Sequence, residues 1–140
     1  MSINTIQDEI IDEFAFFDDW MEKYEYIIDL GKNLPLIDEK YKDENHLIKG
    51  CQSQVWLHAE DEAGKVKFTA DSDAIITKGI IALLVRVLSG QSAKDIAKAD
   101  LYFIDKIGLK EHLSPTRSNG LVSMVKQMKM YGIALNNQKA

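Results

Sequence analysis

Cysteine is the scarcest chemically reactive residue in this sequence: the 140 residues hold only Cys51. One thiol excludes an intramolecular disulfide, a CxxC redox pair and a metal site built from cysteines alone, because each of these needs further thiols. The nucleotide patterns GxGxxG and GxxxxGK[ST] are absent, as is the metal-binding HExxH, and the three histidines show no paired spacing. The sequence therefore indicates neither a nucleotide site nor a metal site.

Positive charge is also in short supply. Seventeen Lys and Arg residues face 22 Asp and Glu residues, which gives a net charge of -5 and a pI near 5.2. This balance argues against a nucleic-acid partner, since binding phosphates needs a basic surface. Residues 1–44 contain 13 acidic and 4 basic side chains, whereas residues 114–140 contain 4 basic and no acidic ones. We expect the two ends to face different surroundings, or each other.

No stretch predicts export or membrane insertion. The first residues lack the basic segment and apolar run of a secretory signal. The longest apolar stretch, residues 74–88, contains Lys78 and Arg86 and is shorter than the roughly 20 apolar residues that a bilayer-spanning helix needs. We expect a cytoplasmic protein with no membrane partner, and the length fits a single domain over residues 1–140.

The spacing of apolar, capping and turn residues predicts the order of the secondary-structure elements. We expect a helix over residues 3–17, a helix over 20–34 capped by Asp18 or Asp19, and a surface connection over 36–49. A β-hairpin over 54–70, with its turn at 61–64, and a largely buried helix over 74–88, capped from Asp71, Ser72 and Asp73, should follow. The remaining elements are a short helix over 92–99, a segment over 101–113 whose ambiguous pattern is closest to another short helix, and a last helix starting at Ser114.

Cys51 is the main candidate for chemistry. Gly50 precedes it and permits a sharp turn, so we expect the thiol on an exposed loop tip. A thiol reacts as its thiolate, which Lys49, Arg117 or a helix N-terminus would favour. The polar neighbours Gln52, Ser53 and Gln54 also suit a functional loop. The alternative, a buried and inert cysteine, stays open at this point.

A catalytic cysteine-histidine pair is a weaker interpretation. His58 follows Cys51 by an odd number of residues, so on an extended chain the two side chains point to opposite faces. His46 and His112 remain as distant candidates for a base beside the thiol.

Four motifs in a fixed order identify a family resemblance. They are EKYEYIIDLG at residues 22–31, GCQSQVW at 50–56, DSDA at 71–74 with Lys78-Gly79, and HLSPTRSNGL at 112–121. Together, over about residues 14–135, they resemble the SufE/CsdE family of sulfur acceptor proteins in iron-sulfur cluster assembly. The resemblance implies an α+β fold in which helices pack on one side of a small antiparallel sheet, similar to scaffold proteins of the IscU kind.

The same resemblance implies a function and a site. Cys51 would accept persulfide sulfur from a pyridoxal-phosphate-dependent cysteine desulfurase of the SufS/CsdA type, stimulate that enzyme, and pass the sulfur to a SufBCD-type cluster scaffold. The protein would be a sulfurtransferase-like carrier acting by transpersulfidation, not an independent enzyme, with the Cys51 persulfide as transient carrier and no permanently bound cofactor. The expected loop and partner-binding residues are Gly50, Gln52, Ser53, Gln54, Asp73 and Arg117.

Two other classes of function remain as alternatives. The protein would be a non-catalytic regulator if it stimulated a desulfurase through its surface without using Cys51. It would be a thiol hydrolase or a one-cysteine peroxidase if it turned over a substrate without any partner protein.

Overall fold

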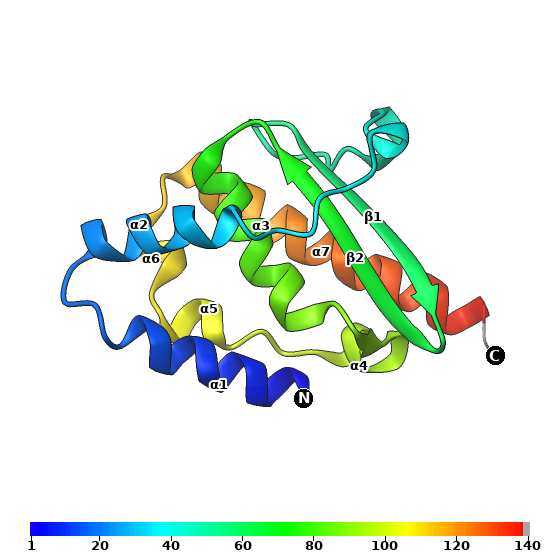
Figure 1. Cartoon of the computed structure of the whole chain (residues 1–140), viewed down its shortest axis with the longest axis horizontal. Helices are drawn as coiled ribbons and strands as arrows, with labels where there is room; N and C mark the ends of the chain where they lie inside the picture. Colours follow the sequence, from blue (N-terminus) through cyan, green and yellow to red (C-terminus); the bar gives the residue numbers. More distant parts are fainter. Residues whose placement is uncertain (139–140) are drawn as a thin grey trace.

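Figure 1 shows the computed structural model, which describes residues 1–138; Lys139, one of the four basic residues of the tail, lies outside them. The elements are α1 Ile3–Phe14, α2 Trp20–Gly31, the 3-10 turns η1 Glu39–Tyr41 and η2 Glu44–His46, β1 Val55–Glu62, β2 Lys65–Ser72, α3 Ile75–Leu88, β3 Gln91–Ser92, α4 Ala93–Lys98, α5 Phe103–Lys106, α6 Leu109–His112 and α7 Pro115–Gln138. Within the described residues no helix combines the length and the apolar character that crossing a membrane requires.

The predicted hairpin is present, and its strands are longer than expected. β1 pairs antiparallel with β2 from Val55 opposite Ser72 to Glu62 opposite Lys65, so the turn is only Ala63-Gly64. Both turn residues have positive φ, 52° and 88°, as a tight hairpin turn requires. The two-residue strand β3 pairs with the start of β2 and was not predicted, because two residues show no alternation.

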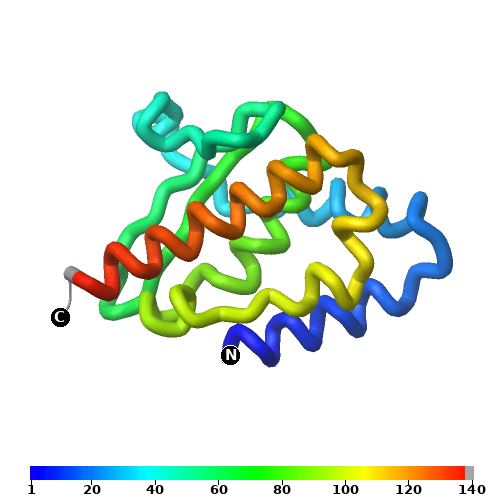
Figure 2. Tube along the Cα trace, turned by 180° about the vertical axis from the view of Figure 1, so that it is seen from behind, coloured from blue at the N-terminus to red at the C-terminus, as the bar shows by residue number. Residues whose placement is uncertain are grey.

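Helices cover one face of this sheet, as predicted for the α+β class. Alternate residues of the hairpin are fully buried and face the helical layer: Val55, Leu57, Val66, Phe68 and Ala70. α3 and α7 lie along that face, and the view from behind shows α7 in front of the hairpin (Figure 2). The core therefore sits between the sheet and these two helices.

α2 packs closely on α3 through two glycines. A Cβ atom on Gly79 would lie 2.1 Å from the carbonyl oxygen of Ile27, and one on Gly31 would lie 3.0 Å from the Gly79 nitrogen. The absence of side chains at both positions lets the two helix backbones approach each other. This contact fixes α2 on α3.

The connection over residues 36–49 does more than cross the surface. The amide of Ile37 donates to the carbonyl of Ala70, and Tyr41 stacks on His58 at 3.8 Å between ring centroids. At its end the amide of Ile48 donates to the carbonyl of Val55 at 2.8 Å. The connection thus lies on the outer side of the hairpin and delivers the chain to Cys51.

Three details of the expected elements are wrong. α1 and α2 each end three residues early, at Phe14 and Gly31, and residues 101–113 form two short helices divided by Gly108, whose φ is +73°. The expected caps of α3 are also wrong: its N-cap is Ala74, with no side-chain hydrogen bond. Asp71 instead pairs with Lys42 and Lys78, at 2.7 and 3.4 Å, so its carboxylate is engaged away from the helix end.

Candidate functional site

Cys51 lies on a short loop, residues 49–54, that rests against the start of α7. Gly50 has a φ of +93°, the conformation expected of a glycine at a sharp turn. A Cβ atom on Gly50 would lie 2.5 Å from the Oγ atom of Ser123 in α7. The Sγ atom of Cys51 donates to the carbonyl oxygen of Gly120 at 3.6 Å. The loop, which we call the Cys51 loop, is therefore seated on residues 120 and 123 of α7.

This seat shelters the thiol, so the expectation of an exposed loop tip is wrong for the conformation described. Cys51 is half-buried, and burial raises the pKa of its thiol above the ordinary value. Its hydrogen-bond partner is a carbonyl oxygen, which accepts a hydrogen bond from the neutral thiol and offers no donor to a thiolate. The resting site thus suits the neutral thiol.

The cations expected to favour the thiolate do not do so here. Arg117 is exposed, and its described hydrogen bond runs from its backbone amide to the Oγ atom of Ser114 at 3.3 Å, which caps α7 as predicted. Lys49 is exposed as well. A lowered thiol pKa is therefore wrong for this conformation, and a role of Arg117 toward a partner stays a prediction.

Three hydrogen bonds hold the Cys51 loop at its C-terminal end, and all involve the backbone of Gln54. Its amide donates to the Oδ1 atom of Asp73 at 3.0 Å, and its carbonyl accepts from the Asp73 amide at 3.3 Å and from the Ser72 hydroxyl at 2.8 Å. Asp73, expected among the loop and partner-binding residues, does contact the loop. Gln52 is exposed and Ser53 half-exposed, so both lie open to a partner.

A cavity of about 510 Å³ opens beside the loop. Its wall is made by the approach to the loop and by the loop itself: Glu44, Asn45, Leu47, Ile48, Lys49, Gly50, Cys51, Gln52, Ser53 and Gln54. One continuous segment forms this wall, so a shift of the loop changes the shape of the cavity.

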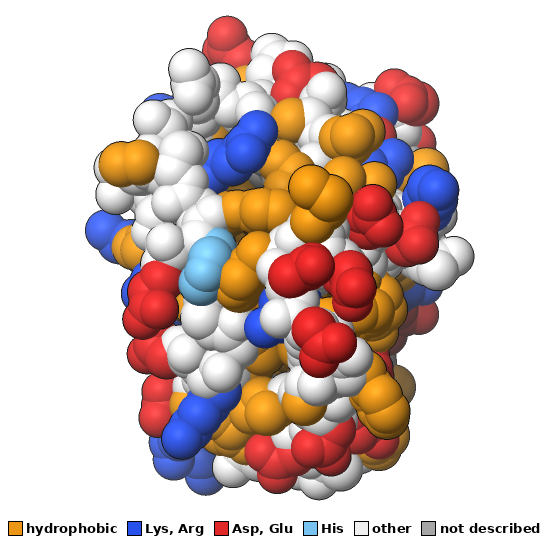
Figure 3. Space-filling model, turned by 90° about the vertical axis from the view of Figure 1, so that its left-hand side faces the viewer, with side chains coloured by type: hydrophobic (Ala, Val, Ile, Leu, Met, Phe, Trp, Pro, Cys, Tyr) orange, Lys and Arg blue, Asp and Glu red, His pale blue; other side chains and the backbone are white. Residues whose placement is uncertain are grey.

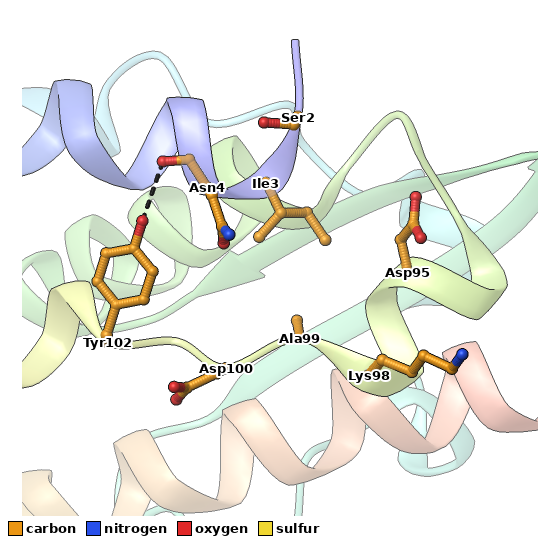
Figure 4. Close-up of a pocket in the computed structure, with 8 residues that line it drawn as sticks. All are labelled: Ser2, Ile3, Asn4, Asp95, Lys98, Ala99, Asp100 and Tyr102. Carbon is orange, nitrogen blue, oxygen red and sulfur yellow. Dashed lines mark hydrogen bonds between the residues drawn. The ribbon is translucent and has the colours of Figure 1, made fainter.

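A second cavity, of about 410 Å³, lies between the start of α1 and the segment after α4 (Figure 4). The Tyr102 hydroxyl lies there within hydrogen-bond distance of two acceptors, the Asn4 carbonyl oxygen at 3.2 Å and the Asp8 Oδ1 atom at 2.8 Å. The lining residues include neither a thiol nor an imidazole. This cavity carries no recognisable chemistry.

The histidines lie away from the thiol. His46 and His58 approach each other at 3.3 Å on the outer side of the sheet, where His46 also contacts Asp43 and His58 contacts Glu60. His112 stacks on Trp20 at 4.0 Å. None of the hydrogen bonds described for residues 1–138 joins an imidazole to Cys51, and the same residues hold no cluster of three or more potential metal ligands.

Sequence reasoning missed two residues of the seat. Gly120 enters the sequence analysis only within the motif at residues 112–121, and Ser123 does not enter it at all. Their spacing of three puts them on one face of a helix, which was the available signal. That this face meets Cys51 depends on a contact across 69 residues, which local patterns do not reveal.

Comparison with known proteins places the chain in a family. Residues 8–132 match the SufE family, described as an Fe-S metabolism associated domain, so the chain belongs to the SufE family. An uncharacterised SufE-like protein of Rhizobium meliloti is 45% identical over 130 residues, which cover 89% of this chain and 93% of that protein. The SufE-like protein 1, chloroplastic/mitochondrial, of Arabidopsis thaliana is 40% identical over 128 residues, 91% of this chain and 34% of that longer protein.

The fold has a counterpart among solved structures. The solution structure of a hypothetical protein from Thermus thermophilus matches with a TM-score of 0.76 at 20% identity, covering 92% of this chain and 94% of that one. At this identity the match supports the α+β fold. Family membership adds Fe-S metabolism as the field of function and implies a cysteine desulfurase as partner.

Proposed function

We propose that this protein carries sulfur: Cys51 takes the outer sulfur of a desulfurase persulfide and delivers it to an iron-sulfur cluster scaffold of the SufBCD type. The observation that carries the proposal is the placement of the single thiol of this SufE-family chain. Cys51 sits on a loop that is attached through Gln54 and turned by Gly50, next to a cavity. A carrier needs such a thiol, which can be sheltered and then presented.

The proposed step is a thiol exchange. The Cys51 thiolate attacks the outer sulfur of the donor persulfide, and a new S–S bond forms as the old one breaks. The electron pair of the broken bond stays on the donor cysteine, which leaves as a thiolate and takes up a proton. No external oxidant or reductant is consumed. A second thiol on the carrier would attack the loaded sulfur and release sulfide, so one cysteine suits the task.

The seat against α7 works against this attack while the loop is docked. Burial and the Gly120 carbonyl both favour the neutral thiol, which is a poor nucleophile. The loop therefore has to leave its seat before transfer, and the desulfurase provides the site that it enters. In that site Gln52, Ser53 and Arg117 are proposed to contact the partner or the persulfide anion, since all three lie at least partly open.

The direct test incubates the protein with a cysteine desulfurase and cysteine and then measures its intact mass. The expected result is a gain of one sulfur atom that a reductant reverses and that Cys51→Ser lacks. An unchanged mass of the wild type would exclude the acceptor function.

Two measurements separate the alternatives. If Cys51→Ser stimulated sulfide release from cysteine as strongly as the wild type, the protein would be a regulator that needs no thiol. If the protein alone consumed peroxide or hydrolysed a substrate, the partner-free enzyme would be favoured. The carrier proposal predicts neither outcome.

A further inference from the structure

The turn between α1 and α2 exposes two large apolar side chains. Phe16, in the turn, is 84% exposed, and Met21, in the first turn of α2, is 73% exposed. Leaving such side chains in water forgoes the free energy that their burial would contribute. Aromatic residues and methionine are enriched at the centre of protein interfaces. Phe16 and Met21 are thus side chains of the kind that a protein partner covers.

Carboxylates surround these two side chains. Asp18, Glu22 and Glu25 are exposed, and none of them forms an ion pair in the part of the chain that the structure describes. Met21 and Glu25 are four residues apart and share a face of α2. We call the surface formed by Phe16, Asp18, Met21, Glu22 and Glu25 the acidic corner. Figure 3, which faces this end of the molecule, shows acidic side chains gathered beside hydrophobic ones.

The acidic corner is joined to Cys51 by residues in direct contact. Trp20, next to Met21, stacks on His112 at the end of α6. The Tyr24 hydroxyl donates to the carbonyl of His112, which fixes α2 to α6. α7 begins three residues after His112, and it reaches the thiol at Gly120 after five further residues, about 8 Å of helix. The corner is therefore linked to the Cys51 end through α6 and the first turns of α7 (Figure 1).

A partner that receives the Cys51 loop also needs a rigid surface to bind. The loop has to move, so ordering it on the partner costs free energy and its contacts yield little affinity. A standard interface covers about 800 Å² of each protein and is roughly 30 Å across, so it extends well beyond the Cys51 loop itself. The helices of the corner are held by stacking and by helix packing, so they supply contacts that need no rearrangement.

We infer that the acidic corner is a second, rigid docking contact for the cysteine desulfurase, which meets it with cationic side chains around an apolar recess. The inference rests on the proposed function and adds to it where the donor binds. The carboxylates accelerate association and make the affinity depend on salt, while Phe16 and Met21 enter the recess. The Cys51 loop then transfers sulfur without having to provide the affinity.

The test measures the dissociation constant of the purified desulfurase for three double variants at low and high salt. Asp18→Lys/Glu25→Lys reverses the charge of the corner, and Phe16→Ser/Met21→Ser removes its apolar anchors. Asp95→Lys/Asp100→Lys is the matched control, with the same change in net charge at the distant α4 end. Asp19 is left unchanged because its side chain caps α2.

The expected result for the charge variant is about tenfold weaker binding at low salt and a smaller loss at high salt. The apolar variant should weaken binding about tenfold at both salt concentrations, and the control should bind within about twofold of the wild type. Equal affinities of the corner variants and the control would overturn the inference.

The mass gained at Cys51 separates this inference from the proposed function. At saturating desulfurase the corner variants should still acquire one sulfur, because the corner supports binding and not the transfer step. If the wild type acquired none, the carrier function itself would fail. If it acquired one and the corner variants bound normally, the docking contact alone would fail.

Discussion

At the scale of single residues, the position of Cys51 on the docked loop makes its thiol sheltered and poorly reactive. The thiol is half-buried and donates to the Gly120 carbonyl, two features that favour its neutral form. A site that raises the thiol pKa protects the cysteine from oxidation and alkylation while it carries no sulfur. The sequence alone allowed a reactive or an inert cysteine. The structure shows the sheltered thiol of the docked loop, and the proposed function requires the loop to leave its seat before the thiol reacts.

The raised pKa predicts the pH dependence of alkylation. Because the folded state favours the neutral thiol, the rate with iodoacetamide should rise at higher pH than in the urea-unfolded chain. The docked loop is correspondingly most stable below the unfolded thiol pKa and is weakened as pH rises through the folded one. A rate profile that coincides with that of the unfolded chain would contradict the sheltered site.

Gly50 offers a test of the seat with an internal control. Gly50→Ala places a methyl group 2.5 Å from the Ser123 hydroxyl, and the backbone there has a φ of +93°. Gly90→Ala introduces the same kind of backbone strain, at a φ of +83°, with nothing within 4 Å of the new atom. Both substitutions should cost about 1 kcal/mol of unfolding free energy in urea, from backbone strain. Only Gly50→Ala should also accelerate alkylation of Cys51, and equal alkylation rates would argue against the contact with Ser123.

At the scale of the elements, the Cys51 loop is attached by the segment between β2 and α3. Asp73 and Ser72, which the sequence led us to expect as helix caps, bond to Gln54. Local patterns rank Asp and Ser as caps, and only the pairing of β1 with β2 brings Gln54 within their reach. The seat of the loop is thus a product of the hairpin register.

Removing the Asp73 carboxylate should release the loop. Asp73→Ala deletes the acceptor of the Gln54 amide, a charge-assisted hydrogen bond whose loss should favour the undocked loop about tenfold. The alkylation rate of Cys51 at neutral pH should rise accordingly. Asp95→Ala, an exposed acidic residue of α4, should leave the rate unchanged. An unaltered rate in Asp73→Ala would show that other contacts hold the loop.

An ion pair ties α1 to the central helix α3. The guanidinium of Arg86 donates two hydrogen bonds to Glu13, at 2.8 and 2.5 Å, and Tyr26 donates a third. The hydrogen bonds from Arg86, opposed by partial burial, hold the pKa of the Glu13 carboxyl below its usual value. Its stabilising effect is therefore present above the unfolded pKa and is lost as pH falls through the folded one.

Arg86→Met should lower the unfolding free energy by about 1–2 kcal/mol at pH 7, a figure reduced for the one-third exposure of both side chains. The difference from the wild type should begin to shrink as pH falls below the ordinary glutamate pKa of about 4.3 and should be lost as pH falls through the lower pKa that Glu13 has in the folded state. Urea denaturation at pH 7 and pH 3 measures both values. Lys32→Met, which breaks an exposed pair with Asp29, should change stability by less than about 0.5 kcal/mol. Equal losses in the two variants would contradict the account of the Arg86 pair.

At the scale of the whole molecule, the sequence predicted what local patterns determine. The helices α2 and α3, the short helix α4 and the start of α7 after Ser114 follow from neighbouring residues and are confirmed. The two-residue strand β3 and the contact between Cys51 and Gly120 depend on residues distant in sequence. Both features follow from the packing of the hairpin and α7 around the same core, which local sequence patterns do not predict.

The core, the Cys51 loop and the acidic corner occupy different parts of the molecule. The sheet and the packed helices form one core, and the Cys51 loop lies at its upper edge in Figure 1. The acidic corner lies at the left end of the same view and is linked to the Cys51 loop through α6 and the start of α7. Rigid elements for binding and one movable loop for transfer are what a carrier between two proteins needs. Sulfur transfer by Cys51 is the central claim of this account.

A single-turnover transfer tests that claim most directly. A desulfurase is loaded with persulfide, freed of cysteine, mixed with this protein and quenched, and the intact masses of both proteins are followed in time. The account predicts that the desulfurase loses one sulfur atom at the rate at which the wild-type chain gains one, and that Cys51→Ser gains none. A desulfurase that loses its sulfur while this chain stays at its original mass would contradict it.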